Sequence, residues 1–294
     1  MSFFTPIKSN GPLDRHRILS KTAGVRVSPL CLGSMSLGNS WKERLSGGTS
    51  QEQSFELLDY FFKQGGNFID TAGNYQDDES EMHIGAWMKA RNNREEIVLA
   101  TKFTSLHKFK GKAGVEIPVN FSGNHKKSLR NGLEASLKKL QTDYVDILYL
   151  HWWDWSTSIE EVMHSLHHLV QSGKILYLGI SDTPAWIVSS ANAYARAHSL
   201  TPFSIYQGKW NVIERDFDRE ILPMCRHEGM AVAPWSVLAS GKLRSAAQVA
   251  EREKERGPIR GGGQSEAHKK MSSTLEAIGK EANDASIAQI AIGE

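Results

Sequence analysis

The 294-residue chain has few cysteines, no long apolar run and almost no net charge. Its two cysteines, Cys31 and Cys225, cannot form a disulfide framework, which indicates a reducing compartment. The 35 Lys and Arg against 33 Asp and Glu argue against a dedicated nucleic-acid-binding protein. No apolar run approaches the ~20 residues of a membrane helix, and the N-terminus lacks the pattern of a signal peptide. These absences predict a cytoplasmic protein without nucleic-acid or membrane partners.

Short apolar segments alternate with longer amphipathic ones along most of the chain. The short segments are rich in β-branched and aromatic residues, as strands covered on both faces are, and span residues 30–34, 67–70, 96–102, 144–150, 174–180, 203–207 and 230–235. The stretches between them carry apolar residues at helical spacing, such as Leu129, Leu133, Leu137 and Leu140. This alternation predicts an α/β fold with a parallel sheet.

The spacing of the predicted strands favours one kind of parallel sheet. Polar residues close the strands at intervals of ~30 residues, which suits a (β/α)8 barrel of ~250 residues. A doubly wound sheet is the rival fold. However, the chain has no G-x-G-x-x-G after a strand and no G-x-x-x-x-G-K-[ST]. We therefore predict a single TIM-barrel domain over residues 1–294.

Residues 251–270 interrupt this pattern. Their sequence, EREKERGPIRGGGQSEAHKK, is charged, rich in glycine and without periodicity. We interpret this segment as a mobile surface loop, because most such stretches are solvated. A lid over a bound ligand is the alternative interpretation.

The carboxyl ends of the strands in a parallel barrel gather at one face, where the active sites of such enzymes lie. Four titratable side chains should meet at that face: Asp70, Tyr75, Lys102 and His151. Each alone has an ordinary explanation, since Asp70 could cap a turn, Lys102 could be a surface charge and His151 could be a core histidine. Their convergence indicates a catalytic site.

The chemistry of these four residues fits together. A tyrosine has a pKa of about 10 in water, and an ammonium about 4 Å away favours the phenolate by up to ~4 kcal/mol. Lys102 can supply that ammonium, and Asp70 would keep it charged. His151 could donate a hydrogen bond to a substrate oxygen. This set predicts that Tyr75 is a general acid that protonates a carbonyl oxygen as the carbonyl receives a hydride.

Several segments resemble those of a known family. FIDTAGNYQDDESE, LATKF, ILYLHWWDW and GISDTPAWIV are similar to motifs of the aldo-keto reductases, most of all the fungal aryl-alcohol dehydrogenases and norsolorinic-acid-reductase-like enzymes. The resemblance covers nearly the whole chain. It implies an NADP-dependent reductase of aldehydes or ketones with Tyr75 as proton donor, serving secondary metabolism as relatives in this branch often do. It also implies that Asp70 lies against the nicotinamide ribose.

The resemblance further implies a set of cofactor contacts. Ser181, Asp182 and Gln207 would hold the nicotinamide carboxamide, with Asp182 in place of the family's commoner Asn. Trp235 would stack on the nicotinamide ring. Four residues of the following loop would contact the pyrophosphate: Ser236, Leu238, Ser240 and Lys242.

Two further groups of side chains are notable. Three tryptophans follow His151: Trp152, Trp153 and Trp155. They fit either core packing or an aromatic wall for a bulky, flat substrate, to which Trp152 and Trp155 would contribute beside His151. Three histidines share a predicted helix face: His164, His167 and His168. No acid or cysteine completes a ligand set with them and HExxH is absent, so we expect no metal site.

The C-terminal sequence ASIAQIAIGE is the last notable feature. The family continues from this point into an eighth strand and a last helix, which carry much of the pocket for adenosine and the 2′-phosphate. The chain as given is therefore expected to be a barrel truncated before its eighth strand, with unpaired edges, poor discrimination between NADP and NAD, and a tendency to self-associate. A cofactor-binding regulatory module and an inactive truncated family member are alternatives to the reductase.

Overall fold

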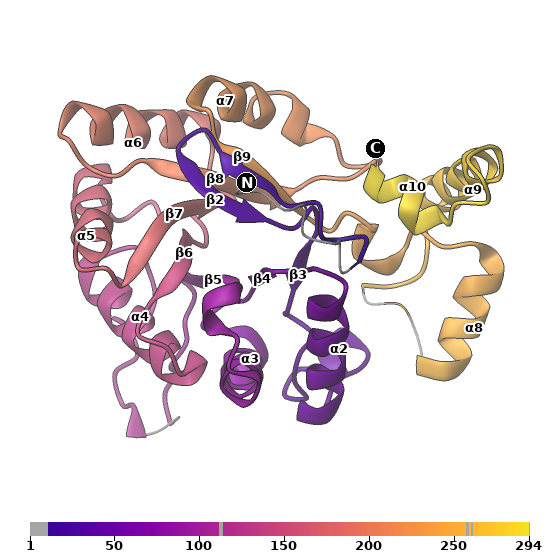
Figure 1. The fold of residues 1–294 in the computed structure, drawn as a ribbon, viewed down its shortest axis with the longest axis horizontal. Helices are drawn as coiled ribbons and strands as arrows, with labels where there is room; N and C mark the ends of the chain where they lie inside the picture. Colours follow the sequence, from indigo (N-terminus) through magenta and orange to yellow (C-terminus); the bar gives the residue numbers. More distant parts are fainter. Residues whose placement is uncertain (1–10, 112–113, 257–258, 260, 294) are drawn as a thin grey trace, which may run out of the picture.

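The computed structural model describes residues 11–111, 114–256, 259 and 261–293. Its centre is a parallel sheet whose strands pair in chain order: β3 (Cys31–Gly33), β4 (Phe68–Asp70), β5 (Val98–Phe103), β6 (Val145–Leu150), β7 (Ile175–Ser181), β8 (Phe203–Lys209) and β9 (Ala231–Trp235). The sheet curls into a nearly closed barrel with helices on its outside (Figure 1). This arrangement confirms the predicted TIM-like α/β fold. Every predicted strand overlaps one of the observed strands.

The helices that follow the strands cover the outer face of the sheet: α2 (Gln51–Lys63), α3 (Glu79–Arg91), α4 (Lys126–Leu140), α5 (Ile159–Gln171), α6 (Ala185–Ala197) and α7 (Ile221–Glu228). Serine side chains cap two of them, because Ser50 accepts a hydrogen bond from the backbone of Gln53 and Ser158 accepts one from that of Glu161. The four leucines expected on one face of α4 are all buried. Shorter helical elements lie at Lys42–Leu45 (α1), Tyr75–Asp78 (η1), Arg94–Glu96 (η2), Asp216–Asp218 (η4) and Ala239–Gly241 (η5).

The barrel has two layers of apolar side chains, because successive residues of a strand point to opposite faces. Leu99 and Leu148 belong to the large cluster that the helices share with the sheet. Val98 and Ile147, beside them in the sequence, belong to a second cluster, which we assign to the interior of the barrel. The interior is therefore filled by side chains, as in other barrels of this kind.

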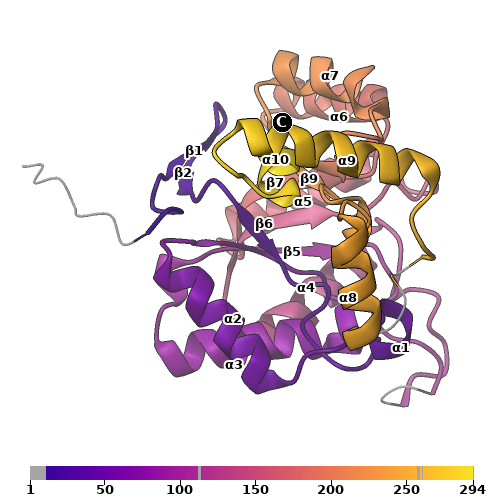
Figure 2. The same ribbon diagram turned by 90° about the vertical axis from the view of Figure 1, so that its right-hand side faces the viewer.

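A hairpin that we did not predict lies at the amino end of the barrel. It consists of β1 (Arg17–Ser20) and β2 (Ala23–Val27), and Val27 is part of the interior cluster. Thr22 in its turn donates a hydrogen bond to Ser204 at the start of β8, with 3.0 Å between the oxygens. Figure 2 shows the hairpin at one end of the barrel and α1 at the other. The hairpin therefore covers the interior of the barrel at its amino end.

Three helices at the C-terminal end form a group beside the barrel: α8 (Ala246–Arg256), α9 (Glu266–Glu281) and α10 (Ile287–Gly293). The predicted loop over residues 251–270 was wrong at both ends, since residues 251–256 belong to α8 and residues 266–270 to α9. Charged Glu, Lys and Arg are good helix formers, and Ser265 caps α9. Residues 257, 258 and 260 lie outside the described residues.

The sheet begins with β3 and ends with β9, and these two strands do not pair with each other. In the described ranges no further strand pairs with the outer edge of either. Among the helices of the described residues, none has the length and apolarity needed to cross a membrane.

Candidate active site

Three of the four residues predicted to be catalytic lie close together because β4, β5 and β6 pair with one another. Asp70 ends β4, Lys102 lies near the end of β5, and His151 directly follows β6. The strands are in parallel register, with Asp70 beside Ala100 and Lys102 beside Tyr149. Because these strands are neighbours, their carboxyl ends meet at one side of the barrel mouth.

Asp70 and Lys102 form a buried ion pair. The Nζ atom of Lys102 lies 2.5 Å from Oδ2 of Asp70 and donates a second hydrogen bond to the carbonyl of Thr71 at 2.8 Å. Gln207 donates a hydrogen bond from Nε2 to the other carboxylate oxygen at 3.2 Å. Burial is the largest single effect on the pKa of Lys102 and lowers it, but the charge and hydrogen bond of Asp70, together with smaller effects of Tyr75 and Cys31, raise the pKa overall. The lysine is therefore a fixed cation.

Tyr75 lies over this cation. Nζ of Lys102 is 5.2 Å from the centre of the Tyr75 ring, and 5.6 Å from the ring of Tyr149. The Tyr75 ring also meets the His151 ring edge to face, with 5.9 Å between centroids. All four residues predicted from the sequence therefore lie together at the mouth.

The predicted direction of the pKa shift of Tyr75 was wrong. Burial raises the pKa of Tyr75, and this effect outweighs the lowering by Lys102. Asp70 and Asp182 raise it further, because their negative charges oppose a phenolate. Asp70 offsets much of the field of the lysine with which it is paired. The phenol is therefore protonated at neutral pH, which is the state that a general acid requires.

His151 is neutral. Burial, with the charge of Lys102 as a second cause, lowers its pKa to about 3. Its Nδ1 lies 3.2 Å from Oγ of Ser105, and its backbone N–H donates to Oγ1 of Thr104 at 3.3 Å. Ser105 follows β5 and was not among the predicted residues.

The turn that carries Tyr75 has a strained backbone. Gln76, Asp77 and Asp78 have φ values of 51°, 51° and 95°, in the left-handed region that non-glycine residues rarely adopt. The buried Gln76 side chain holds the turn, because its Nε2 donates to the carbonyl of Met35 at 2.8 Å and its Oε1 accepts from the backbone of Trp41 at 2.7 Å. Strain of this kind persists only where the surroundings enforce it, and it is frequent at functional sites.

A partly buried lysine holds the other side of the same turn. Lys139 of α4 donates to the carbonyl of Gly73 at 2.9 Å and contacts Oδ1 of Asp78 at 2.7 Å. Its Nζ also lies 2.7 Å from Oε2 of Glu81, while Oε1 of Glu81 accepts a hydrogen bond from Thr101 at 2.6 Å. Thr101 precedes Lys102 in β5. The network therefore ties the turn with Tyr75 to the strand with Lys102.

The residues predicted to hold a nicotinamide lie at the ends of β7, β8 and β9. Ser181 pairs with Gln207 in the sheet, and Asp182 donates its backbone N–H to the carbonyl of Gln207 at 3.1 Å. Nε1 of Trp235 donates to Oδ1 of Asp182 at 3.1 Å. Gln207 reaches Asp70. These residues form the side of the mouth next to the catalytic set.

The loop after β9 supplies further polar groups. Ser236 and Ser240 have left-handed backbones, and their hydroxyl oxygens lie 3.2 Å apart. Lys242 donates from Nζ to the carbonyl of Gly261 at 3.1 Å. Leu238 instead packs against α9 and α10. Together with the partly exposed indole of Trp235, these groups fit a nicotinamide dinucleotide, which needs a flat face, amide partners and phosphate donors.

The tryptophans after His151 have different environments. Trp153 is buried in the main core, which excludes it from the predicted wall. Trp152 and Trp155 are 40% and 67% exposed. The ring of Trp155 lies 6.3 Å from that of Trp186, at the start of α6, which the sequence did not single out.

The histidines of α5 have protein partners. Nε2 of His164 lies 3.2 Å from the hydroxyl of Tyr194, and Nδ1 of His167 lies 3.0 Å from that of Thr201. No group of three or more side chains suited to a metal ion occurs among the described residues.

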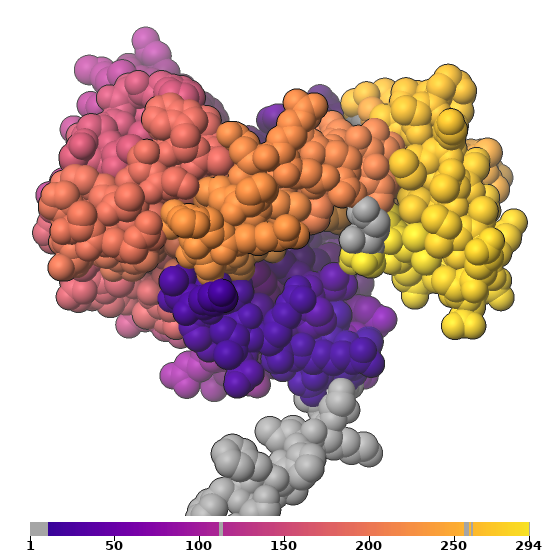
Figure 3. Space-filling model, turned by 90° about the horizontal axis from the view of Figure 1, so that it is seen from above, coloured from indigo at the N-terminus to yellow at the C-terminus, as the bar shows by residue number. Residues whose placement is uncertain are grey.

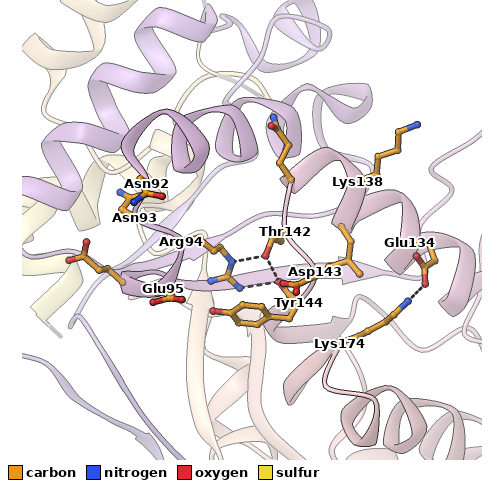
Figure 4. A pocket seen from close by; sticks show the side chains of 13 residues that line it. Asn92, Asn93, Arg94, Glu95, Glu134, Lys138, Thr142, Asp143, Tyr144 and Lys174 are labelled. Atoms are coloured by element: carbon orange, nitrogen blue, oxygen red, sulfur yellow. Dashed lines mark hydrogen bonds and ion pairs between the residues drawn. The ribbon is translucent and has the colours of Figure 1, made fainter.

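An open groove lies on another part of the surface, between the segments that lead into β5, β6 and β7 (Figure 4). Three of its charged side chains form ion pairs. Arg94 binds Asp146 at 2.8 Å and Thr142 at 3.1 Å, and Lys174 pairs with Glu134. The groove lies at the amino ends of these strands, whereas the catalytic set lies at their carboxyl ends, so it belongs to a different face of the barrel.

Comparison with known proteins agrees with this geometry. Residues 29–293 match the aldo/keto reductase family. The chain is 54% identical over 284 residues to a putative aryl-alcohol dehydrogenase of Saccharomyces cerevisiae, covering 95% of this chain and 75% of that protein. It is 54% identical over 271 residues to norsolorinic acid reductase of Aspergillus flavus, covering 92% and 68%. It is 49% identical over 288 residues to aryl-alcohol dehydrogenase [NADP(+)] of Phanerodontia chrysosporium, covering 95% and 74%.

The fold and these matches define the protein as an oxidoreductase built on an α/β barrel. The chain belongs to the aldo/keto reductase family.

Proposed function

We propose that the protein is an NADP-dependent reductase that converts an aromatic or bulky aldehyde or ketone into an alcohol. The observation that carries this proposal is the fixed cation of Lys102 beneath Tyr75, with neutral His151 against the same ring. The relative named aryl-alcohol dehydrogenase [NADP(+)] supports the choice of cofactor. The relatives named norsolorinic acid reductase support a role in fungal secondary metabolism.

The cofactor supplies the hydride in this reaction. His151 orients the substrate by donating a hydrogen bond to the carbonyl oxygen. As negative charge develops on that oxygen, Tyr75 transfers its phenolic proton to it and becomes a phenolate. Lys102 stabilises the phenolate, and Asp70 keeps the lysine charged and in place. Solvent then returns a proton to Tyr75.

The cofactor would be held by the residues that line the other side of the mouth. Ser181, Asp182 and Gln207 would bind the carboxamide, and Trp235 would cover the nicotinamide ring. In the structure Gln207 donates a hydrogen bond to Asp70, and Trp235 donates one to Asp182. These bonds would hold both side chains in place beside the cofactor. The loop over residues 236–242 would bind the pyrophosphate through Ser236, Leu238, Ser240 and Lys242.

Substitution of the proton donor tests the proposal. Tyr75→Phe removes only the phenolic O–H, so turnover of an aryl aldehyde should fall by ~10²–10⁴-fold while NADPH affinity stays nearly unchanged. Steady-state kinetics give the turnover, and quenching of tryptophan fluorescence gives the affinity. Tyr60→Phe is the matched control, because Tyr60 is an exposed tyrosine of α2. A Tyr75→Phe rate within about threefold of the parent would contradict the assignment.

The same assay separates the reductase from the two alternatives. NADPH binding without oxidation, tested on a panel of aromatic aldehydes and ketones, would favour a cofactor-binding regulatory module. Absence of both binding and turnover would favour an inactive family member.

A further inference from the structure

Ser105 connects the catalytic histidine with a neighbouring tryptophan. Its Oγ lies 3.2 Å from Nδ1 of His151 and 3.1 Å from Nε1 of Trp152. Ser105 lies in the segment after β5, close to Lys102, whereas His151 and Trp152 follow β6. Two neighbouring strand ends are thus bridged by a single hydroxyl group.

The chemistry of the three groups favours one arrangement of the hydrogens. An indole N–H is only a donor, so Trp152 donates to Ser105. The hydroxyl of Ser105 has one hydrogen left to donate, and Nδ1 of His151 is the only acceptor within hydrogen-bond distance among the described residues. Donation from Ser105 to Nδ1 satisfies both groups. Nδ1 is then the acceptor, and the ring hydrogen lies on Nε2.

The charge state of the histidine supports the same assignment. A pKa of about 3 means that His151 is neutral near pH 7, so only one of its two nitrogens carries a hydrogen. The described residues make no hydrogen bond to Nε2. The Nε2–H group is therefore available to a ligand at the mouth.

The backbone around the bridge is held in place. Thr104, next to Ser105, has a φ of 94°, a costly conformation for a β-branched residue. Its Oγ1 accepts from the backbone N–H of His151 and donates to Oδ1 of Asn124 at 2.6 Å. Asn124 in turn donates to the carbonyl of Trp152 at 3.2 Å. The strained turn and these bonds fix the position of Ser105 relative to both of its partners.

We propose that Ser105, oriented by Trp152, is a positioning residue that fixes His151 in the tautomer with its hydrogen on Nε2. Trp152 then supports the histidine rather than serving only as part of a substrate wall. The tautomer is a property of the free protein. Its use, to present Nε2–H to a carbonyl oxygen, rests on the proposed reductase function.

Three substitutions of Ser105 distinguish an effect on the tautomer of His151 from an effect on local packing. Ser105→Thr keeps the hydroxyl and should retain the parent tautomer and activity. Ser105→Ala removes the donor, so the two tautomers should mix and turnover should fall by about tenfold. Ser105→Asp replaces the donor with an acceptor, so the hydrogen should move to Nδ1 and turnover should fall by ~10²–10³-fold, as on loss of an oxyanion donor. Ser172→Ala, at the exposed end of α5, is the control.

The tautomer is measured directly by long-range ¹H–¹⁵N NMR of the ¹⁵N-labelled protein without substrate, with His151→Gln to assign the signals. The parent and Ser105→Thr should show the Nε2–H pattern, and Ser105→Asp the Nδ1–H pattern. A hydrogen on Nδ1 in the parent, or an Nε2–H pattern unchanged in both Ser105→Ala and Ser105→Asp, would overturn the proposal. If the expected patterns appear in a protein that reduces no carbonyl, the role of Ser105 stands and the proposed function fails.

Discussion

At the scale of the single residue, the depressed pKa of His151 has a consequence for stability. Its pKa of about 3 in the folded protein lies below the value of about 6.5 in an unfolded chain. Between these values the unfolded chain binds more protons, so this residue makes the free energy of unfolding rise with pH and adds no pH dependence above about 6.5. His151→Gln should therefore flatten the rise between about pH 4 and about pH 6.5. Urea unfolding across that range, with the exposed His198→Gln as control, measures the difference, and equal slopes in parent and His151→Gln would contradict it.

Also at this scale, Trp155 and Trp186 form an exposed aromatic pair in the segments that follow β6 and β7. If they receive the aromatic part of a substrate, Trp155→Ala and Trp186→Ala should raise KM for a bicyclic aryl aldehyde by about tenfold, since stacked aromatic pairs contribute ~0.5–1.5 kcal/mol beyond area burial. A small aliphatic aldehyde should be little affected. Kinetics on the two substrates check this, and equal losses for both would indicate a general structural effect.

The sequence predicted the position of individual residues in the fold well where they follow a strand. Asp70, Lys102 and His151 each come at or just after an apolar segment, and parallel pairing brings such positions together. Ser105 carried no comparable signal, because a serine after a strand is common and its role depends on the distances to two partners. The pKa direction of Tyr75 was missed for a related reason. It depends first on how deeply Tyr75 is buried and then on how far Asp70 offsets Lys102, and spacing along the chain gives neither.

At the scale of the element, the strained turn with Tyr75 depends on Lys139. Lys139→Met would leave the fully buried Glu81 without its cation, and breaking a buried pair costs ~3–5 kcal/mol. Release of the turn should also lower kcat for the aldehyde more than it weakens NADPH binding. Lys138→Met, an exposed neighbour in the same helix, is the control.

Thermal unfolding and kinetics of both variants check this. Lys139→Arg keeps the charge and should recover most of the loss, whereas equal behaviour of Lys138→Met and Lys139→Met would contradict the role of the turn.

Strands and helices could be predicted from the sequence where their apolar residues form a clear pattern. The seven strands of the barrel are apolar segments, and all were found. The end of α8 was missed because EREKER is charged throughout, so no apolar face marks a helix whose stability comes from helix-forming residues. The hairpin at residues 17–27 was missed because Arg17, Arg26 and other polar residues dilute its apolar positions. The hairpin buries Val27 inside the barrel, and this burial is evident only in the folded molecule.

At the scale of the whole molecule, the C-terminal helices have a core of their own. Figure 3 shows them as a lobe beside the barrel. Leu275, Ile287 and Ala291 of α9 and α10 form an apolar cluster with Ala239 and Leu243, which follow β9, and this cluster is distinct from the two clusters of the barrel. Leu238 of the proposed pyrophosphate loop packs on the same cluster. The stability of this lobe is therefore linked to the cofactor side of the mouth more closely than to the catalytic set.

This separation predicts that the lobe opens locally, below the free energy of global unfolding. Ile287→Ala should cost ~2–5 kcal/mol within the lobe and reduce amide protection in α9 and α10, while α3 to α6 keep theirs. NADPH affinity should fall because the loop over residues 236–242 loses support, whereas the pKa of His151 stays as in the parent. Leu148→Ala, in the main core, should instead lower protection throughout the barrel. Hydrogen exchange with mass spectrometry and NADPH titration distinguish the two variants. If Ile287→Ala reduced protection equally in α4 and α9, the lobe and the barrel would form one cooperative unit and this prediction would be wrong.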